Sequence, residues 1–185
     1  MLMAVTVPRY TIQDLDSFPD DGNRYELLDG VLLVTPAPAP LHQRVVARLL
    51  VVLNAYLSPT GKAEALPGSV EIEPNLHLEP DVLVVPAGEF AKGLTVETSW
   101  SDIRSWWLAI EVSGTGSVVY DRDHKGPAYL AVGVREFWRV DLQEECVYLR
   151  QSGGREEIRL AERVVWHPPE LANPLSISIP SLFRM

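Results

Sequence analysis

Two acidic residues interrupt apolar runs of strand length in this chain. Asp81 opens an aliphatic run at 82–85, and Glu111 lies inside a second apolar run at 106–113. Such runs are normally buried, and an unpaired ionised carboxylate in a buried strand costs several kcal/mol or shifts its pKa. A divalent metal bound by hard oxygen ligands would satisfy both acids. The alternative is that Asp81 merely follows the turn residue Pro80 and that Glu111 lies on the solvent face of an edge strand.

A basic residue that could serve such a site as its cation lies downstream. Lys125 ends the charged segment at 121–125, and Gly126-Pro127 follows it directly. Proline disfavours helical conformation for its predecessor and fits only the first turn of a helix. We therefore expect Lys125 to lie in the loop before a short helix. The role of the neighbouring His124 stays open.

Length and composition indicate one soluble globular domain over residues 1–185. The chain is 46% hydrophobic and 22% charged, no apolar stretch is long enough to span a membrane, and the N-terminus lacks the basic start of a secretory signal. We therefore expect a cytoplasmic protein. The net charge of −9 argues against broad adhesion to nucleic acid, but a local basic face or a bound metal can offset it. Cys146 is the only cysteine, which excludes an internal disulfide and a cysteine zinc site.

Hydrophobic periodicity predicts an α/β or α+β fold. Asp29-Gly30 separates two apolar runs and predicts a hairpin over 24–34, because this dipeptide tolerates positive φ. Apolar residues at helical spacing predict a main packing helix over 41–56. We further expect a helix that starts after Thr11, a short helix through Leu130, strands at 69–74, 81–86 and 107–113, a half-buried strand at 134–141, and a terminal hairpin of 146–150 with 156–160.

Six segments, taken in their order along the chain, carry a resemblance to a known family. They are Tyr25-Glu26-Leu27-Leu28-Asp29-Gly30, Pro40-Leu41-His42-Gln43, Glu79-Pro80-Asp81-Val82, Ile110-Glu111-Val112-Ser113, Asp121-Arg122-Asp123-His124-Lys125 and the block from Tyr129 to Asp141. In this order and spacing the chain resembles the Uma-type family of restriction endonucleases, within the PD-(D/E)XK nuclease superfamily, over residues 10–182. The resemblance implies a restriction endonuclease-like core with a mixed central β-sheet flanked by helices.

The resemblance also implies a metal site. Asp81 and Glu111 would hold Mg²⁺ or Mn²⁺ from neighbouring strands, together with waters and the Val112 carbonyl. Ser113 stands where the superfamily places its lysine, and Lys125 matches the lysine that looks like its substitute in this family. Such a lysine orients the attacking water and stabilises phosphate oxygens.

Two further residues could join this site. Glu26 matches the family's early acid, as an additional metal ligand or a water-orienting group, and its alternative is a residue on the polar face of a strand. His42 could contact the site or a phosphate, or it could cap the helix that it opens or be partly buried there.

Three functions remain compatible with these residues. The first is a metal-dependent endonuclease that hydrolyses DNA phosphodiester bonds, and its rival is a catalytically silent domain that acts in dimerisation or protein binding. The third is a nuclease subunit that depends on a separate DNA-targeting protein, since no DNA-reading motif is recognisable. We expect a homodimer, because Trp106, Trp107, Trp138 and the apolar run at 174–180 indicate more apolar surface than one small domain hides. These tryptophans are expected in the core or in dimer contacts rather than as platforms for base stacking.

Overall fold

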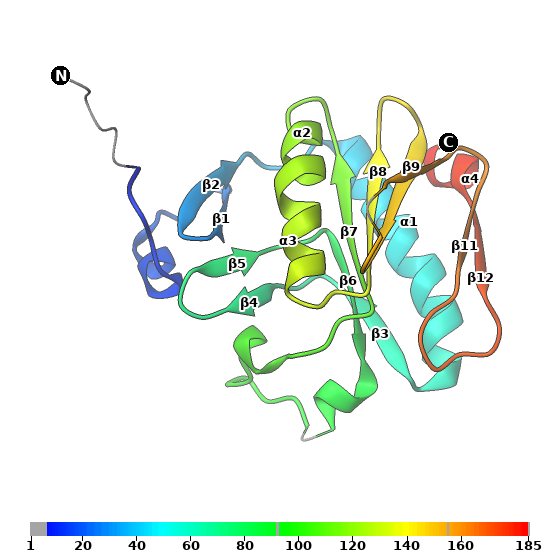
Figure 1. Cartoon of the computed structure of the whole chain (residues 1–185), viewed down its shortest axis with the longest axis horizontal. Helices are drawn as coiled ribbons and strands as arrows, with labels where there is room; N and C mark the ends of the chain where they lie inside the picture. The colour runs from blue at the N-terminus through cyan, green and yellow to red at the C-terminus, as the bar shows by residue number, and fades with distance from the viewer. Residues whose placement is uncertain (1–6, 92, 155, 185) are drawn as a thin grey trace.

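The computed structural model describes residues 7–91, 93–154 and 156–184 (Figure 1). The first six residues, on which the expected lack of a secretory signal partly depends, lie outside the described residues. The described chain contains a six-stranded sheet, a four-stranded sheet and a two-stranded ribbon. No helix in the described ranges combines the length and the apolar character that a membrane crossing requires.

The six-stranded sheet places Glu111 in a central strand. Its order is β10-β9-β8-β7-β6-β3, and β7 runs parallel to β8 while the other neighbouring strands are antiparallel. This is the expected mixed sheet, and it removes the alternative that Glu111 lies on an edge strand. The strands are β3 (Ala63–Leu66), β6 (Val82–Pro86), β7 (Leu108–Ser113), β8 (Glu136–Asp141), β9 (Cys146–Gln151) and β10 (Ile158–Leu160).

The four-stranded sheet carries Glu26. Its order is β2-β1-β5-β4, formed by β1 (Arg24–Leu28), β2 (Val31–Thr35), β4 (Val70–Ile72) and β5 (Leu76–Leu78). The hairpin of β1 and β2 turns at Asp29-Gly30, where φ is 49° and 77°, so the prediction from this dipeptide is confirmed.

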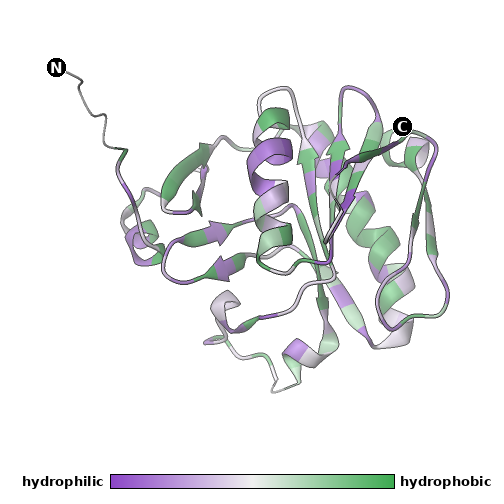
Figure 2. Cartoon of the chain, in the orientation of Figure 1, coloured by the Kyte–Doolittle hydropathy of each residue, from purple (hydrophilic) through white to green (hydrophobic). Residues whose placement is uncertain are grey.

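Helices cover both faces of the large sheet (Figure 1). Helix α1 (Pro40–Leu57) packs with Val82 and Val84 on one face, while Leu83 and Val85 face the other side together with Tyr129. This alternation follows from the period of two residues along a strand. The second face is covered by one helical run composed of α2 (Val118–Tyr120), the π-helical turn η5 (Asp121–Lys125) and α3 (Gly126–Ala131). The central strands are accordingly coloured mostly as hydrophobic in Figure 2.

The remaining elements are short. The antiparallel ribbon of β11 (Arg163–Trp166) and β12 (Leu175–Ser178) packs with α4 (Ile179–Phe183) against the core beside α1. Four 3₁₀ turns complete the described part of the fold: η1 (Ile12–Ser17), which Thr11 caps, η2 (Ser58–Thr60), η3 (Ala87–Phe90) and η4 (Trp100–Asp102).

The strand over 134–141 differs from its prediction. All six residues of β8 are buried, so it is not half-buried. Its charged side chains have polar partners inside the protein: Arg139 Nη1 lies 3.0 Å from Asp141 Oδ2, and Glu136 Oε1 accepts a hydrogen bond from the Trp138 indole. Alternation of apolar and charged residues therefore marks a strand here, but not a solvated face, because paired charges can be buried.

The prediction for Lys125 is wrong. Lys125 does not lie in a loop before a helix, because residues 118–131 are helical throughout and Lys125 ends the π-helical turn. The helical run can contain Pro127 because this residue directly follows the π-helical turn and Gly126. Proline lacks an N–H and is accepted where the regular hydrogen-bond ladder is already interrupted, as it is beside a π-helical turn.

Candidate active site

Asp81 and Glu111 lie opposite each other on neighbouring strands. In the antiparallel pairing of β6 with β7, Val82 is the partner of Ile110, so the next position toward the end of the sheet aligns Asp81 with Glu111. The Val112 N–H donates a hydrogen bond of 2.8 Å to Asp81 Oδ2 and holds this carboxylate against β7. The side chains of Asp81 and Glu111 are only 3% and 4% exposed.

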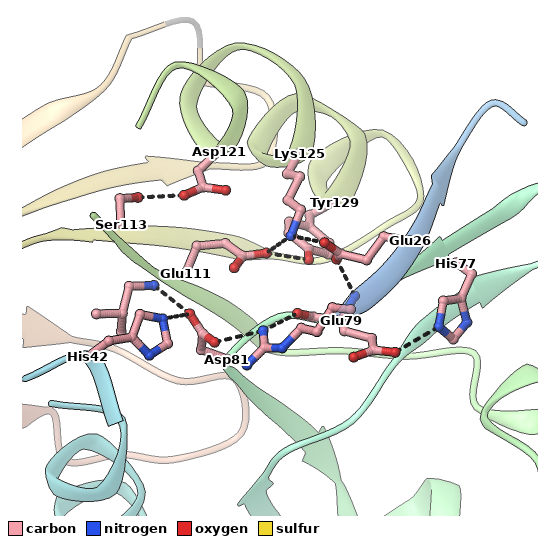
Figure 3. A network of polar contacts seen from close by, with 12 residues as sticks. Glu26, His42, His77, Glu79, Asp81, Glu111, Ser113, Asp121, Lys125 and Tyr129 are labelled. Atoms are coloured by element: carbon pink, nitrogen blue, oxygen red, sulfur yellow. Dashed lines mark hydrogen bonds and ion pairs between the residues drawn. The ribbon is translucent and has the colours of Figure 1, made fainter. Parts of the chain in front are cut away.

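Lys125 bridges Glu111 and Glu26 (Figure 3). Its Nζ lies 2.6 Å from Glu26 Oε2 and 3.1 Å from Glu111 Oε1, while the Tyr129 hydroxyl donates a 2.7 Å hydrogen bond to Glu111 Oε1. Burial disfavours the charge on Lys125, but Glu111, Glu26 and Asp121 outweigh it and hold the pKa of this amine above its usual value. The surroundings of Lys125 therefore favour its charged ammonium form.

Glu111 lies in an environment that disfavours its own charge. Burial and the neighbouring acids Asp121, Asp81 and Glu26 raise its pKa well above the usual value, against the opposing effect of Lys125. A further cation beside this carboxylate would relieve the excess negative charge. This is the electrostatic condition that a metal-binding carboxylate is expected to show before its ion is bound.

Asp81 shows the opposite behaviour. Burial raises the pKa of this carboxyl, but its polar neighbours outweigh burial and lower the pKa. These neighbours are His42, through its hydrogen bond and charge, Arg24, through its charge, and the Val112 N–H. Arg24 Nη1 lies 2.9 Å from Asp81 Oδ1, and His42 Nε2 lies 3.0 Å from Oδ2. His42 thus contacts the candidate site from the first turn of α1. The two central acids consequently differ: their surroundings lower the pKa of Asp81 and raise the pKa of Glu111.

Glu26 is fully buried, so it does not lie on a polar strand face. Its Oε1 accepts a hydrogen bond of 2.7 Å from the Glu79 backbone N–H, and its Oε2 faces Lys125. These contacts join the small sheet to the segment before β6 and to the helical run at the site.

The helical run positions three side chains on one face. Asp121, Lys125 and Tyr129 follow one another at intervals of four residues, and all three are buried toward β7. Gly126 allows this close approach, because a Cβ at that position would lie 2.6 Å from the Phe137 ring. Ser113 donates a hydrogen bond of 2.7 Å to Asp121 Oδ2. Ser113 therefore anchors the helix that supplies Lys125.

These side chains surround a cavity of about 520 Å³. Glu26, Asp81, Glu111, Asp121 and Lys125 line it, and its side walls come from β2 and its continuation at 32–36 and from the 114–120 segment. His124 is exposed outside this lining and lies against the Tyr120 ring, so it is not among the residues brought together here.

The oxygen donors of the cavity fit a hard divalent cation. Asp81 accepts three hydrogen bonds on a carboxylate that has about four lone-pair positions, and both hydrogen bonds to Glu111 end on Oε1. One position on Asp81 and the Oε2 atom of Glu111 are therefore open to an ion, within the described residues. In those same ranges no three His, Cys, Asp or Glu side chains are already arranged around a common metal position. Waters would have to complete the coordination, as is usual for Mg²⁺.

Several site residues were not singled out from the sequence. Arg24, Asp121 and Tyr129 belong to segments that carried the resemblance or flanked it, but they were assigned no role. The four-residue spacing of Asp121, Lys125 and Tyr129 is a signal that could have identified two of them. Arg24 has no such signal, because its contact with Asp81 joins positions 57 residues apart.

Comparisons with known proteins identify a family and a similar fold. The model of the family Uma2, described as "Putative restriction endonuclease", matches residues 12–180. A solved structure, described as a "putative nuclease belonging to DUF820" from Anabaena variabilis ATCC 29413, is similar with a TM-score of 0.74 and 19% identity, over 94% of this chain and 97% of that chain. The expected fold is thus confirmed by a nuclease-like neighbour. The comparison with curated proteins found no match.

Proposed function

Because this chain belongs to the Uma2 family of restriction endonuclease-like proteins, we propose that it is a metal-dependent endonuclease that hydrolyses DNA phosphodiester bonds. The observation that supports this proposal most strongly is the group of Asp81, Glu111 and Lys125 in one cavity. Two carboxylates of opposite electrostatic character face each other there, and a buried ammonium contacts one of them. This is a donor set suited to an ion and to a phosphate that carries negative charge.

Asp81, Glu111 and the Val112 carbonyl would hold Mg²⁺ or Mn²⁺. The N–H and the carbonyl of one strand residue point to the same side, so the Val112 carbonyl faces the Asp81 side as its N–H does. When bound, such an ion lowers the pKa of a coordinated water and neutralises charge on the scissile phosphate.

The other side chains would position these ligands and bind the substrate. Tyr129 and Lys125 fix Glu111 Oε1, which directs Oε2 of the same carboxylate toward the ion. Lys125 has a third N–H that can donate to a phosphate oxygen, in addition to its contacts with Glu26 and Glu111. Glu26 holds Lys125 in this position and is the proposed additional acid of the site. Catalysis would require Arg24 or His42 to share Asp81 with the ion.

The proposed alternative is a catalytically silent domain that acts in dimerisation or protein binding. One observation favours it: Arg24 and His42 already pair with Asp81 and compensate the negative charge of this carboxylate without an ion. We retain a homodimer, a cytoplasmic location and a single domain over 1–185 as parts of the proposal. A nuclease subunit that depends on a separate DNA-targeting protein stays a second alternative to it. The tryptophans no longer argue for a dimer, because Trp106, Trp107 and Trp138 are all buried within the chain.

A cleavage assay tests the proposed function. Purified protein is incubated with supercoiled plasmid and with labelled oligonucleotides, with Mn²⁺, with Mg²⁺ and with a chelator. We expect metal-dependent cleavage that falls by at least about a hundredfold in Glu111→Gln, since an ion-holding carboxylate stabilises developing charge by several kcal/mol. Glu64→Gln on the exposed face of β3 is the matched control and should cleave like the wild type. Equal cleavage by Glu111→Gln, or none by the wild type on any substrate, would contradict the proposal.

A further inference from the structure

The acids of the candidate site lie deep below the protein surface. The side chains of Glu26, Asp81 and Glu111 are at most 4% exposed, and Lys125 is 6% exposed. A phosphate that reaches an ion on these oxygens must therefore enter the cavity between β2 and the 114–120 segment. The phosphates of a duplex lie on a rigid, convex surface with stacked pairs behind them, whereas an unpaired nucleotide can leave its neighbours and enter a pocket.

The cavity offers few free positive charges. Arg24 and Lys125 are the lysines and arginines that line it, and both already contact carboxylates. Against them stand four acids: Glu26, Asp81, Glu111 and Asp121. Duplex binding depends on rows of lysine and arginine that neutralise successive phosphates. The described lining of this cavity lacks such a row.

The walls of the cavity are instead apolar and aromatic. Leu32, Leu33, Val34 and Pro36 line the cavity on the β2 side, and Leu33, the register partner of Glu26, shares the face of the small sheet that carries this acid. Tyr120 of α2 also lines the cavity, is partly exposed, and lies against His124, whose ring centre is 5.0 Å away. Unstacked bases pack on aromatic and apolar side chains of this kind. A volume of about 520 Å³ is also that of a pocket that encloses a small ligand.

We propose that this cavity receives an unpaired DNA nucleotide, with its base between Tyr120 and the apolar wall of β2, and that the protein selects single-stranded DNA over duplex. The inference rests on the proposed function for the cleavage step, but the preference for an unpaired strand can be measured by binding alone. The acidic cavity would then bind one phosphate, at the ion. Contacts of the base with Tyr120 and the apolar wall would supply the rest of the affinity for the nucleotide.

Three oligonucleotides of one sequence test this inference: a single strand, a perfect duplex, and a duplex with an internal unpaired bubble. Cleavage by the wild type is followed with Mn²⁺. Binding is measured by fluorescence anisotropy with the Glu111→Gln variant, which should not cut the strands, and Glu64→Gln again serves as the control variant. We expect the single strand to be bound and cut at least about tenfold better than the duplex, and the bubble to be cut only where it is unpaired.

Variants of Tyr120 report on the base contact. Stacking of one base contributes about 1–3 kcal/mol, so Tyr120→Ala should weaken single-strand binding about fivefold to 150-fold. Tyr120→Phe keeps the ring and should bind like the wild type, which separates stacking from any role of the hydroxyl. Unchanged thermal unfolding of both variants establishes that the fold is intact.

The outcomes separate the inference from the proposed function. Duplex bound and cut as well as single strand would overturn the inference and leave the nuclease proposal standing. Tyr120-dependent selection of single strands without any cleavage would support the inference and refute the nuclease proposal. If Tyr120→Ala binds like the wild type, the proposed base position is wrong.

Discussion

Lys125→Met is the substitution whose effect follows most directly from the geometry of the site. Methionine keeps a long apolar side chain but removes the ammonium that lies 2.6 Å from Glu26 and 3.1 Å from Glu111. Removal of one partner from a buried ion pair costs about 3–5 kcal/mol, because the remaining charge is left without compensation. Since two buried carboxylates lose their partner, we expect the free energy of unfolding to fall by about 4 kcal/mol at pH 7.5. For a chain of this size that corresponds to roughly 8–16 °C in Tm.

The loss should depend on pH. Without Lys125 the pKa of Glu111, already raised by burial and by its acidic neighbours, rises further above its value in the unfolded chain. A carboxyl with a raised pKa in the folded state is most favourable to stability at low pH and loses that contribution as pH rises above the unfolded value. The variant should therefore approach the wild type near pH 5 and diverge from it toward pH 8.

Urea denaturation followed by tryptophan fluorescence measures this difference at both pH values. The exposed Lys62→Met is the matched control and should change stability by no more than about 0.5 kcal/mol. The double variant Lys125→Met with Glu26→Gln should recover part of the loss, because it removes one of the stranded charges. A loss below about 1 kcal/mol, or one that is the same at pH 5 and pH 8, would refute the reasoning.

Three further predictions concern neighbouring groups and assembly. Asp81→Asn should weaken Mn²⁺ binding, measured by calorimetry, at least tenfold. It should also lower the free energy of unfolding by about 1–3 kcal/mol, because Arg24 loses a charged partner. Unchanged Mn²⁺ affinity would exclude Asp81 as a ligand. His77 lies between Glu71 and Glu79, which raise its pKa to about 9 against the effect of burial. His77→Gln should therefore lower the free energy of unfolding by about 1–2 kcal/mol below pH 6.5, and this difference should disappear as the pH rises past 9. Equal denaturation curves at pH 6 would contradict this. Light scattering should give twice 20.6 kDa for the proposed homodimer, and a monomer mass at high concentration would dismiss it.

The elements with strong local signals could be predicted from the sequence. Asp29-Gly30 specifies its hairpin through turn chemistry, and the helix expected over 41–56 extends from Pro40 to Leu57. The short strands β3 and β5 were not predicted. Their three or four residues include alanine, glutamate and histidine, which have little preference for strands, and pairing with β6 and β1 decides their conformation.

Local sequence signals pointed to only part of the site, and the roles of Glu26 and Lys125 came from the family resemblance. Glu111 was identified because it is an acid in an apolar run. Lys125 was placed in a loop because the local effect of Pro127 was expected to dominate, whereas packing of Gly126 on Phe137 and a π-helical turn hold the segment in a helix. His77 is enclosed by Glu79, two residues along the chain, and by Glu71, which the pairing of β4 with β5 brings opposite it. Contacts of this kind depend on tertiary structure, which residue spacing does not encode.

Diffraction from crystals soaked in Mn²⁺, recorded where manganese scatters anomalously, tests the central claim most directly. We expect one anomalous peak between Asp81 and Glu111, with metal–oxygen distances of about 2.0–2.2 Å and with Arg24 or His42 shifted from its present contact with Asp81. Crystals of Glu111→Gln should lack this peak. Fully soaked wild-type crystals with no manganese at these carboxylates, and with Arg24 and His42 still bound to Asp81, would contradict the account.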